Sequence, residues 1–480
     1  MNDLGLLWIE AAILLPLFAA PVLWQSRNVD RARSWSISIA IATLAMLILG
    51  WLSHVFLLDP DAPPATVVAV GWQVRLFQFD NFNAPLLVLV GLVHLLAIAT
   101  TVRRKMVRFS FARALMIEAL TLATLASQSN WLLISLLALG AIPPWRELRQ
   151  RHRSSRVFAL HLIGSTVCLA AGQMLVDAEG GGQHISIAAT LLLLFGTAIR
   201  CGLVPFHCWL PDLYENAGFG TALIYTTPLT GAYAAARLLL PIAPSWAIQL
   251  LSALALLSAV YAAGMALVQQ EVRRYFSYFL LSYSSIVVLG LTMDRTTGLA
   301  GGLCVWLSAG LAIAGMGSVL RAVEARVGHL SLLRFHGLYD QVPLLAMFFL
   351  LCGLAVVGFP GTFGFIGNEM LFDGAISTGL HVALALIMAT AINGISLLNV
   401  YFRVFAGGTH RSTISISRRP AERLAVLGLS AIILAGGIFP QAIVASRYQA
   451  AVNLLATRPS TGHNEEIALS EGPLLHPAAE

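Results

Sequence analysis

The sequence predicts an all-α, polytopic membrane protein with about fourteen transmembrane helices. Of its 480 residues, 58% are hydrophobic and 11% are charged, whereas a soluble globular chain carries about 25% charged residues. Apolar runs of roughly 20 residues recur along the chain, and each is long enough to cross a hydrocarbon core of ~30 Å. The sequence shows no alternating pattern of barrel strands, so helices remain as the structure that satisfies every backbone polar group in lipid.

The apolar runs divide residues 1–441, which we expect to form a single membrane domain. The first run contains Glu10 and lacks both a basic leader region and a clear cleavage site, so we expect it to remain as the first helix. The predicted spans are 4–24, 35–57, 83–102, 110–128, 130–145, 157–176, 185–204, 220–240, 246–268, 275–293, 298–320, 342–372, 378–402 and 421–441. Residues 442–480 are polar and rich in Pro, Ser and Glu, and are expected to form a disordered tail.

Positive charge alternates between the predicted connections. Connections after odd-numbered helices are rich in arginine, as at 27–33, 103–108 and 146–156, whereas those after even-numbered helices are neutral or acidic. By the positive-inside rule, both termini are expected on the outer side of the membrane. The connection after the seventh helix is an exception, because it carries Asp212 and Glu215 instead of arginine.

Several function classes are poorly supported by the sequence. The net charge of +6 comes from short arginine clusters between apolar runs, not from one extended basic face, so no nucleic-acid partner is expected. The five cysteines lack the spacing of a zinc site or of a disulfide framework. We also find no nucleotide-binding glycine loop, nucleophile elbow or metal-ligand cluster, and therefore expect no metal, no cofactor and no catalytic chemistry in this chain.

Two predicted spans contain helix-breaking residues. Pro205 lies at the end of the seventh span, and Pro360 interrupts the twelfth together with Gly361 and Gly364. Proline removes a backbone hydrogen bond and clashes with the preceding turn of a helix. Two interrupted helices, five helices apart, are typical of transporters built from inverted repeats, in which the broken segments line the binding site.

Ionisable side chains inside the predicted spans are candidates for function, because each costs roughly 2.5–3.5 kcal/mol at the centre of a membrane helix. Arg200 lies just before the seventh-helix break and Glu118 lies in the fourth span. Glu118 has a structural alternative, which is to pair with Arg113 or to reach the membrane interface. His161 in the sixth span likewise has the alternative of a structural hydrogen bond.

Three segments carry a resemblance to a known family. The segment 200–212, which reads RCGLVPFHCWLPD, resembles the motif at the end of helix seven in complex I antiporter-like subunits, with Arg200 at the family's central lysine and His207 at its histidine. Residues 358–369 resemble the glycine-rich break in the family's helix twelve, and 271–274 resemble the step into helix ten. The chain therefore looks like a member of the proton-conducting family that includes complex I antiporter-like subunits and Mrp antiporter subunits.

The resemblance implies a fold, a location and a site. The implied fold has two inverted five-helix repeats, helices four to eight at 110–240 and helices nine to thirteen at 246–402, in a multi-pass subunit of a bacterial inner membrane with its termini on the periplasmic side. Protons are expected to pass along water held at the helix breaks. The residues expected to form this path are Arg200, His207, Glu369, His161, Glu118 and Tyr225.

This sequence departs from the family pattern at the expected site. Lys105 is its only lysine and lies in a connection, and no carboxylate occupies 138–140, where the family's helix-five glutamate is expected. The guanidinium of Arg200 holds its proton, so it cannot alternate between charged and neutral forms as a lysine does. These departures argue against a conventional pumping site.

Among family members, this chain looks most like the DabB-type membrane subunit of inorganic carbon transporters, because of its missing lysines and the sequence of residues 335–369. The resemblance implies a large, soluble, zinc-containing, DabA-like partner that traps carbon dioxide as bicarbonate, energised by protons or cations admitted through this chain. Two alternatives remain open. The first is a proton-pumping subunit of a complex-I-like NADH-quinone oxidoreductase or a cation/proton antiporter, with the other subunits of such a complex as partners. The second is a non-conducting membrane scaffold.

Overall fold

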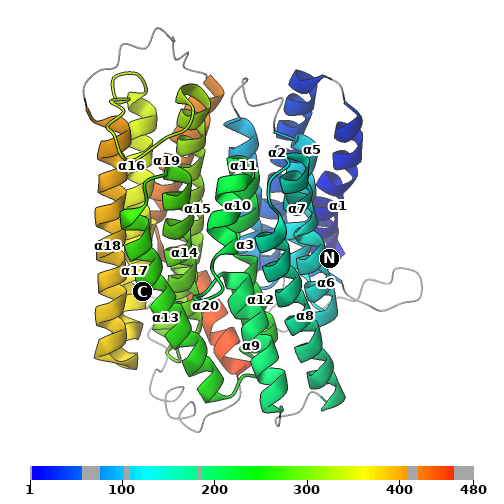
Figure 1. Cartoon of the computed structure of the whole chain (residues 1–480). Coiled ribbons are helices and arrows are strands. Elements are labelled where there is room, and N and C mark those ends of the chain that lie inside the picture. The colour runs from blue at the N-terminus through cyan, green and yellow to red at the C-terminus, as the bar shows by residue number, and fades with distance from the viewer. Residues whose placement is uncertain are drawn as a thin grey trace, which may run out of the picture.

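The computed structural model describes residues 3–26, 28–56, 76–101, 109–180, 185–407 and 420–458. Within these ranges the chain is a bundle of helices, and the only extended pairings are isolated bridges between Phe77 and Ser127 and between Glu271 and Ser331. Figure 1 shows the N-terminal helices at one edge of the bundle and the yellow helices of the 340–405 region at the opposite edge. The all-α membrane fold predicted from the sequence is confirmed.

The helices have the following bounds in chain order. They are α1 Asp3–Gln25, α2 Val29–Phe56, α3 Ala84–Ala99, α5 Phe111–Ala126, α6 Asn130–Gly140, α7 Ile142–Gln150, α8 Arg156–Ala178, α9 Ile187–Cys201, α10 Trp209–Asn216, α11 Phe219–Thr226, α12 Thr230–Ala234, the π-helix Ala235–Leu239, α13 Ser245–Val268, α14 Val272–Leu291, α15 Thr296–Val327, α16 Pro343–Val357, α17 Phe363–Thr378, α18 Leu380–Phe405, α19 Pro420–Ile438 and α20 Gln441–Ala456.

Seven helices in the described part of the chain are long and apolar enough to cross a membrane, and the bent pair α19 and α20 would make an eighth. α14 and α15 lie at the centre, since 94% of each apolar window is buried, whereas α1, α2 and α8 bury about a third. Three shorter apolar helices, α3, α9 and α16, add to these. The described long spans are fewer than the fourteen predicted because several predicted spans are divided between short helices.

Both predicted helix breaks are present. The seventh span ends with α9 at Cys201, where Gly202 takes a left-handed conformation with φ 70°, and the chain resumes as α10 at Trp209. The twelfth span divides into α16 and α17, with left-handed Gly358 and Gly361 between them. Gly364 is required by packing, because a Cβ there would lie 1.8 Å from the carbonyl oxygen of Ala355. These breaks follow from proline and glycine in the sequence.

Two further spans are divided where continuous helices were predicted. The span 220–240 is α11, a turn through Pro228 and Leu229, α12 and a π-helix, and Leu229 has a positive φ of 52°. The span 130–145 ends as α6 at Gly140, and α7 continues from Ile142 to Gln150. The prediction of unbroken helices was wrong here, because Pro228 and the Pro143–Pro144 pair remove helical hydrogen bonds.

The expected disordered tail is also wrong at its start. Residues 441–456 form α20, which turns by 73° from α19 and packs against α15. Arg447 is fully buried and donates hydrogen bonds to the carbonyl oxygens of Phe82, at 3.0 Å, and Asn81. Arg458 donates to the carbonyl of Met293 at 2.8 Å. These two arginines satisfy carbonyls in the turn before α3 and after the end of α14, and so hold α20 against the bundle. Residues 459–480 lie outside the described residues.

We expect Arg447→Ala to loosen α20, because the substitution leaves the carbonyls of Asn81 and Phe82 without their donor. Unsatisfied buried polar groups cost about 1–3 kcal/mol. The thermal midpoint of the detergent-solubilised protein should fall, and limited proteolysis should cleave near 439–441 sooner than in wild type. Gln449→Ala, on the exposed face of the same helix, should change neither result, and equal behaviour of the two variants would contradict the clamping role.

Candidate ion-conducting site

The first part of the site is a small cavity beside Arg200, at the end of α9. Arg200 is only 5% exposed, and its guanidinium carbon lies 5.8 Å from the ring centroid of Tyr225 on α11. Both side chains line a cavity of about 30 Å³. Gly231 closes one wall, since a Cβ there would lie 2.8 Å from the backbone carbon of Arg200. The unpredicted break in the eighth span therefore helps to form this cavity.

Arg200 has no counter-charge in the described part of the chain. Its Nη1 atom is buried without a hydrogen-bond partner, and so is the hydroxyl of Tyr225. The polar groups that line the cavity come from Cys201, Trp209, Tyr225, Thr226, Thr230 and Ser284, and no Asp or Glu is among the lining residues. In a non-conducting scaffold, Arg200 would be held in a structural salt bridge. No such bridge is present among the described residues.

Glu118 is the second unpaired ionisable residue. It lies on α5, is 0% exposed, and neither carboxylate oxygen has a hydrogen-bond partner in the ranges that the structure covers. The structural alternative in which Glu118 pairs with Arg113 is wrong. Arg113 instead forms an ion pair with Glu147 at 2.8 Å and a hydrogen bond with Gln150 at 2.6 Å.

The two candidate histidines differ in their surroundings. His207 is half-buried in the turn between α9 and α10, its Nδ1 is unpaired within the described residues, and its ring centroid lies 5.1 Å from that of Tyr261. His161 on α8 donates from Nδ1 to the carbonyl oxygen of Val157 at 2.8 Å. That bond to its own helix is the structural alternative considered for His161.

The twelfth-helix break places its two polar residues on opposite faces. Asn368 is 3% exposed and donates to the carbonyl of Val357 at 3.1 Å, across the break. Glu369, one residue further, lies on the exposed face of α17 together with Asp373. Glu369 therefore does not join the Arg200 cavity within this chain, and the buried polar group at this break is neutral.

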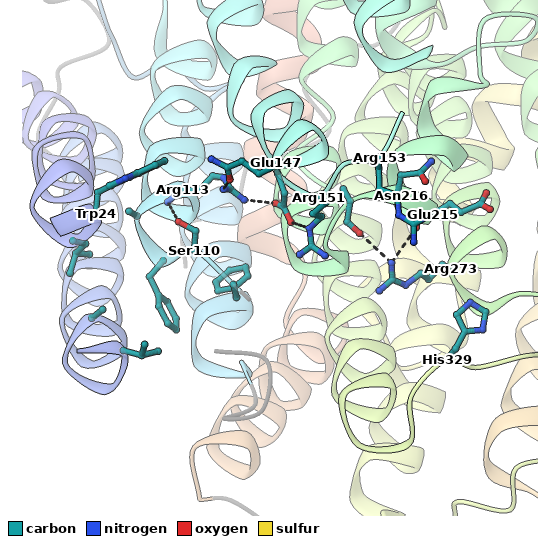
Figure 2. A pocket seen from close by; sticks show the side chains of 18 of the residues that line it. Trp24, Ser110, Arg113, Glu147, Arg151, Arg153, Glu215, Asn216, Arg273 and His329 are labelled. Carbon is teal, nitrogen blue, oxygen red and sulfur yellow. Dashed lines mark hydrogen bonds and ion pairs between the residues drawn. The ribbon is translucent and has the colours of Figure 1, made fainter. Parts of the chain in front are cut away.

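A larger charged chamber, of about 990 Å³, lies at the helix ends near the arginine-rich connections (Figure 2). Its central acid is Glu147, which is 2% exposed and pairs with Arg113 and with Arg151 at 2.7 Å. Glu147 also accepts a hydrogen bond of 3.0 Å from the backbone N–H of Gly218. These arginines lie in connections that were predicted to set the topology. Glu147 was not predicted as a site residue, although the Pro143–Pro144 pair before it signals a break in the span.

Other ion pairs border the same chamber. Arg273 pairs with Glu324 at 2.7 Å, and Arg274 pairs with the exposed Glu215 at 3.0 Å. Figure 2 shows Arg273, Glu215 and Asn216 on one side of the chamber and Trp24 with Arg113 on the other. The chamber is large enough for many waters. Its lining carries five arginines and three glutamates, so positive charge is in excess there.

No cluster of three or more metal-ligating side chains occurs among the described residues. A bundle of membrane-length helices, broken near its middle and carrying unpaired ionisable groups inside, defines a polytopic helical membrane protein of the transporter class.

Residues 157–393 match the family described as NADH:quinone oxidoreductase/Mrp antiporter, TM. The NADH-quinone oxidoreductase subunit 14 of Thermus thermophilus is 30% identical over 349 residues, covering 69% of this chain and 79% of that protein. The chain belongs to this family.

Further similarity extends over nearly the whole chain. NAD(P)H-quinone oxidoreductase chain 4 1 of Synechococcus sp. is 27% identical over 486 residues, covering 92% of this chain and 91% of that protein. A chain of respiratory complex I from Thermus thermophilus superposes with a TM-score of 0.80 at 23% identity, covering 94% of this chain and 100% of that one. A chain of the Mrp complex from Dietzia sp. DQ12-45-1b superposes with a TM-score of 0.75 at 19% identity. The match covers 95% of this chain and 97% of that one. The resemblance read from the sequence is confirmed at the level of the family.

Proposed function

We propose that this chain is a proton-conducting membrane subunit of a multisubunit complex in a bacterial inner membrane. The observation that carries the proposal is the burial of Glu118 and Arg200 inside the helical bundle without an ion-pair partner in the described chain. A charge left alone at this depth costs several kcal/mol. Water or a mobile ion must therefore reach these groups, and a family built around helix breaks provides the route.

The proposed path begins at the charged chamber and enters the first repeat, residues 110–240. Glu118 serves as the buried proton carrier, and His207 and Tyr225 supply exchangeable protons near the seventh- and eighth-helix breaks. His161 belongs to the path only as a secondary group, because its Nδ1 is held by its own helix. The second repeat, residues 246–402, continues the path without a buried charge at its break, since Asn368 occupies the inner face there.

Arg200 acts in this proposal as a fixed charge. Guanidinium keeps its proton at any physiological pH, so Arg200 orients hydroxyls and water without relaying protons. A fixed charge is compatible with passive proton flow down a gradient. It is less compatible with pumping, in which the central group must change its charge. We therefore favour the DabB-type role, in which proton or cation entry energises a DabA-like, zinc-containing partner for inorganic carbon uptake.

A second candidate is a subunit of a complex-I-like NADH-quinone oxidoreductase or a cation/proton antiporter. It is favoured by the names of the relatives, which are quinone oxidoreductase chains, and by superposition on a chain of an Mrp complex. The same proton path would then be driven by subunits elsewhere in the assembly. Purifying the tagged chain from its native membrane and identifying the accompanying subunits by mass spectrometry distinguishes a zinc protein of the carbon-uptake type from oxidoreductase or antiporter subunits.

The exposed acids of α17 indicate where such a partner docks. Glu369 and Asp373 lie one turn apart on a face of α17 that also exposes Ile376 at 61%. Carboxylates on a lipid-facing helix are costly, so we propose that a neighbouring membrane subunit covers them with a basic or hydrated surface. Glu369 joins the proton path at that interface.

We expect Glu369→Gln combined with Asp373→Asn to reduce the partner recovered with the tagged chain, while membrane insertion stays normal. Co-purification followed by quantitative mass spectrometry measures the change. The matched control is Ser377→Ala on the exposed part of the same helix, which should retain the partner. Full recovery of the partner with the double variant would remove these acids from the interface.

A further inference from the structure

Arg200 carries a positive charge that the described chain does not neutralise. Its side chain is 5% exposed, Nη1 has no hydrogen-bond partner, and no ion pair involving Arg200 occurs in the described ranges. The other deeply buried arginines differ. Arg447 donates to two carbonyls, and Arg321 donates to the carbonyl of Ala97 and the hydroxyl of Thr101. Arg200 is thus a buried cation with unused donors.

Arg200 borders a small cavity that is partly open. The cavity beside Arg200 has a volume of about 30 Å³, and a single water needs about 10–15 Å³ measured in this way. The cavity therefore accepts an occupant of one or two water volumes. A carboxylate side chain could have neutralised Arg200, but no Asp or Glu is among the described residues that line this cavity.

The groups around the cavity are suited to an anion. The hydroxyl of Tyr225 has no hydrogen-bond partner among the described residues, and Tyr225 lines the same cavity as Arg200. The hydroxyls of Thr226 and Ser284 are engaged with the carbonyls of Ala222 and Leu281. A cation here would meet the guanidinium at close range and be repelled, whereas an anion receives charge-assisted hydrogen bonds.

We propose that the cavity beside Arg200 binds a small, monovalent inorganic anion of the halide class, which supplies the missing counter-charge. The volume favours a monatomic ion such as chloride over a polyatomic ion of four or more heavy atoms. The anion is held between the guanidinium of Arg200 and the hydroxyl of Tyr225. Because it is exchangeable, the charge at the seventh-helix break depends on the anion concentration outside the protein.

This inference rests on the proposed function, because it names a ligand of the proposed conducting site. Anion binding is measured separately from proton flux, so the anion site can fail its test while the proton path is still tested on its own. The full-length chain, purified with its accompanying subunits in gluconate buffer and placed in nanodiscs, is titrated with radioactive chloride in a scintillation proximity assay. We expect saturable binding near one site per chain, with displacement by unlabelled bromide and not by gluconate.

Three variants test the geometry. Arg200→Gln should abolish saturable binding, and Tyr225→Phe, which removes a single donor, should weaken it about tenfold. The matched control is Tyr283→Phe, which removes another buried and unpaired hydroxyl that does not line the cavity, and it should bind chloride as wild type does. Tyr225→Phe keeps the ring and the volume, so it remains informative if Arg200→Gln fails to fold.

Absence of saturable chloride binding in wild type, or equal binding in the Tyr225 and Tyr283 variants, would overturn the proposal and leave the cavity to water. Proton flux is measured on the same preparations with chloride replaced by gluconate. Flux without chloride binding would show that the conducting path stands while the anion site does not.

Discussion

Glu147→Ala is expected to cause a large loss of stability. Glu147 is 2% exposed, pairs with Arg113 and Arg151, and accepts from the N–H of Gly218. Removing one partner of a buried ion pair costs about 3–5 kcal/mol, because the remaining charge stays buried without compensation. We expect a markedly lower thermal midpoint, measured by fluorescence-detected size exclusion after heating, and reduced yield from the membrane.

The control for this prediction is Glu215→Ala in the same charged chamber. Glu215 pairs with Arg274, but their side chains are 53% and 41% exposed, and such exposed pairs contribute about 0–1 kcal/mol. The midpoint of Glu215→Ala should therefore stay close to that of wild type. If Glu147→Ala is no less stable than Glu215→Ala, then Glu147 does not hold α5, α7 and α11 together.

Glu118→Gln is expected to lower proton flux about tenfold or more, as removal of a positioned proton carrier does. Proteoliposomes containing a pH-sensitive dye and driven by a potassium diffusion potential provide the measurement. The substitution conserves volume and removes a carboxylate that has no hydrogen-bond partner in the described structure. Burial of that charge is costly, so the variant should be at least as stable as wild type.

The combination of lost flux and unchanged stability separates a proton carrier from a structural residue. A structural carboxylate would lower the thermal midpoint when it is replaced, whereas a proton carrier need not. Glu10→Gln, the same substitution at a partly exposed position on membrane helix α1, is the matched control and should conduct as wild type. Wild-type flux through Glu118→Gln would remove Glu118 from the path.

The sequence by itself determined the fold class, the family and the two main breaks. Long apolar runs require helices in lipid, and Pro205 and Pro360 with their neighbouring glycines interrupt a helix wherever it lies. The segment 200–212 also carried the family resemblance without any tertiary information. These features depend on backbone chemistry and local order, which a sequence displays directly.

Tertiary structure alone decided which polar residues meet. A membrane helix is apolar on nearly every face, so its hydrophobic pattern does not separate the face toward lipid from the face toward its neighbours. For this reason the sequence could not tell that Asn368 lies inside and Glu369 outside. For the same reason the sequence could not tell which acid Arg113 pairs with. Arg113 forms an ion pair with Glu147 on another helix, and Glu118 is unpaired in the described structure.

The tail and the Arg200 cavity also depend on tertiary contacts that the sequence does not display. The polar composition after residue 441 indicated disorder, yet Arg447 finds the carbonyls of Asn81 and Phe82, more than 360 residues away in sequence. The cavity beside Arg200 exists because α9, α11 and α12 converge around the break at Leu229. Local sequence determined that the chain forms membrane helices and where its two main breaks lie. Packing between distant helices determined which charges are neutralised and which are left for water or ions.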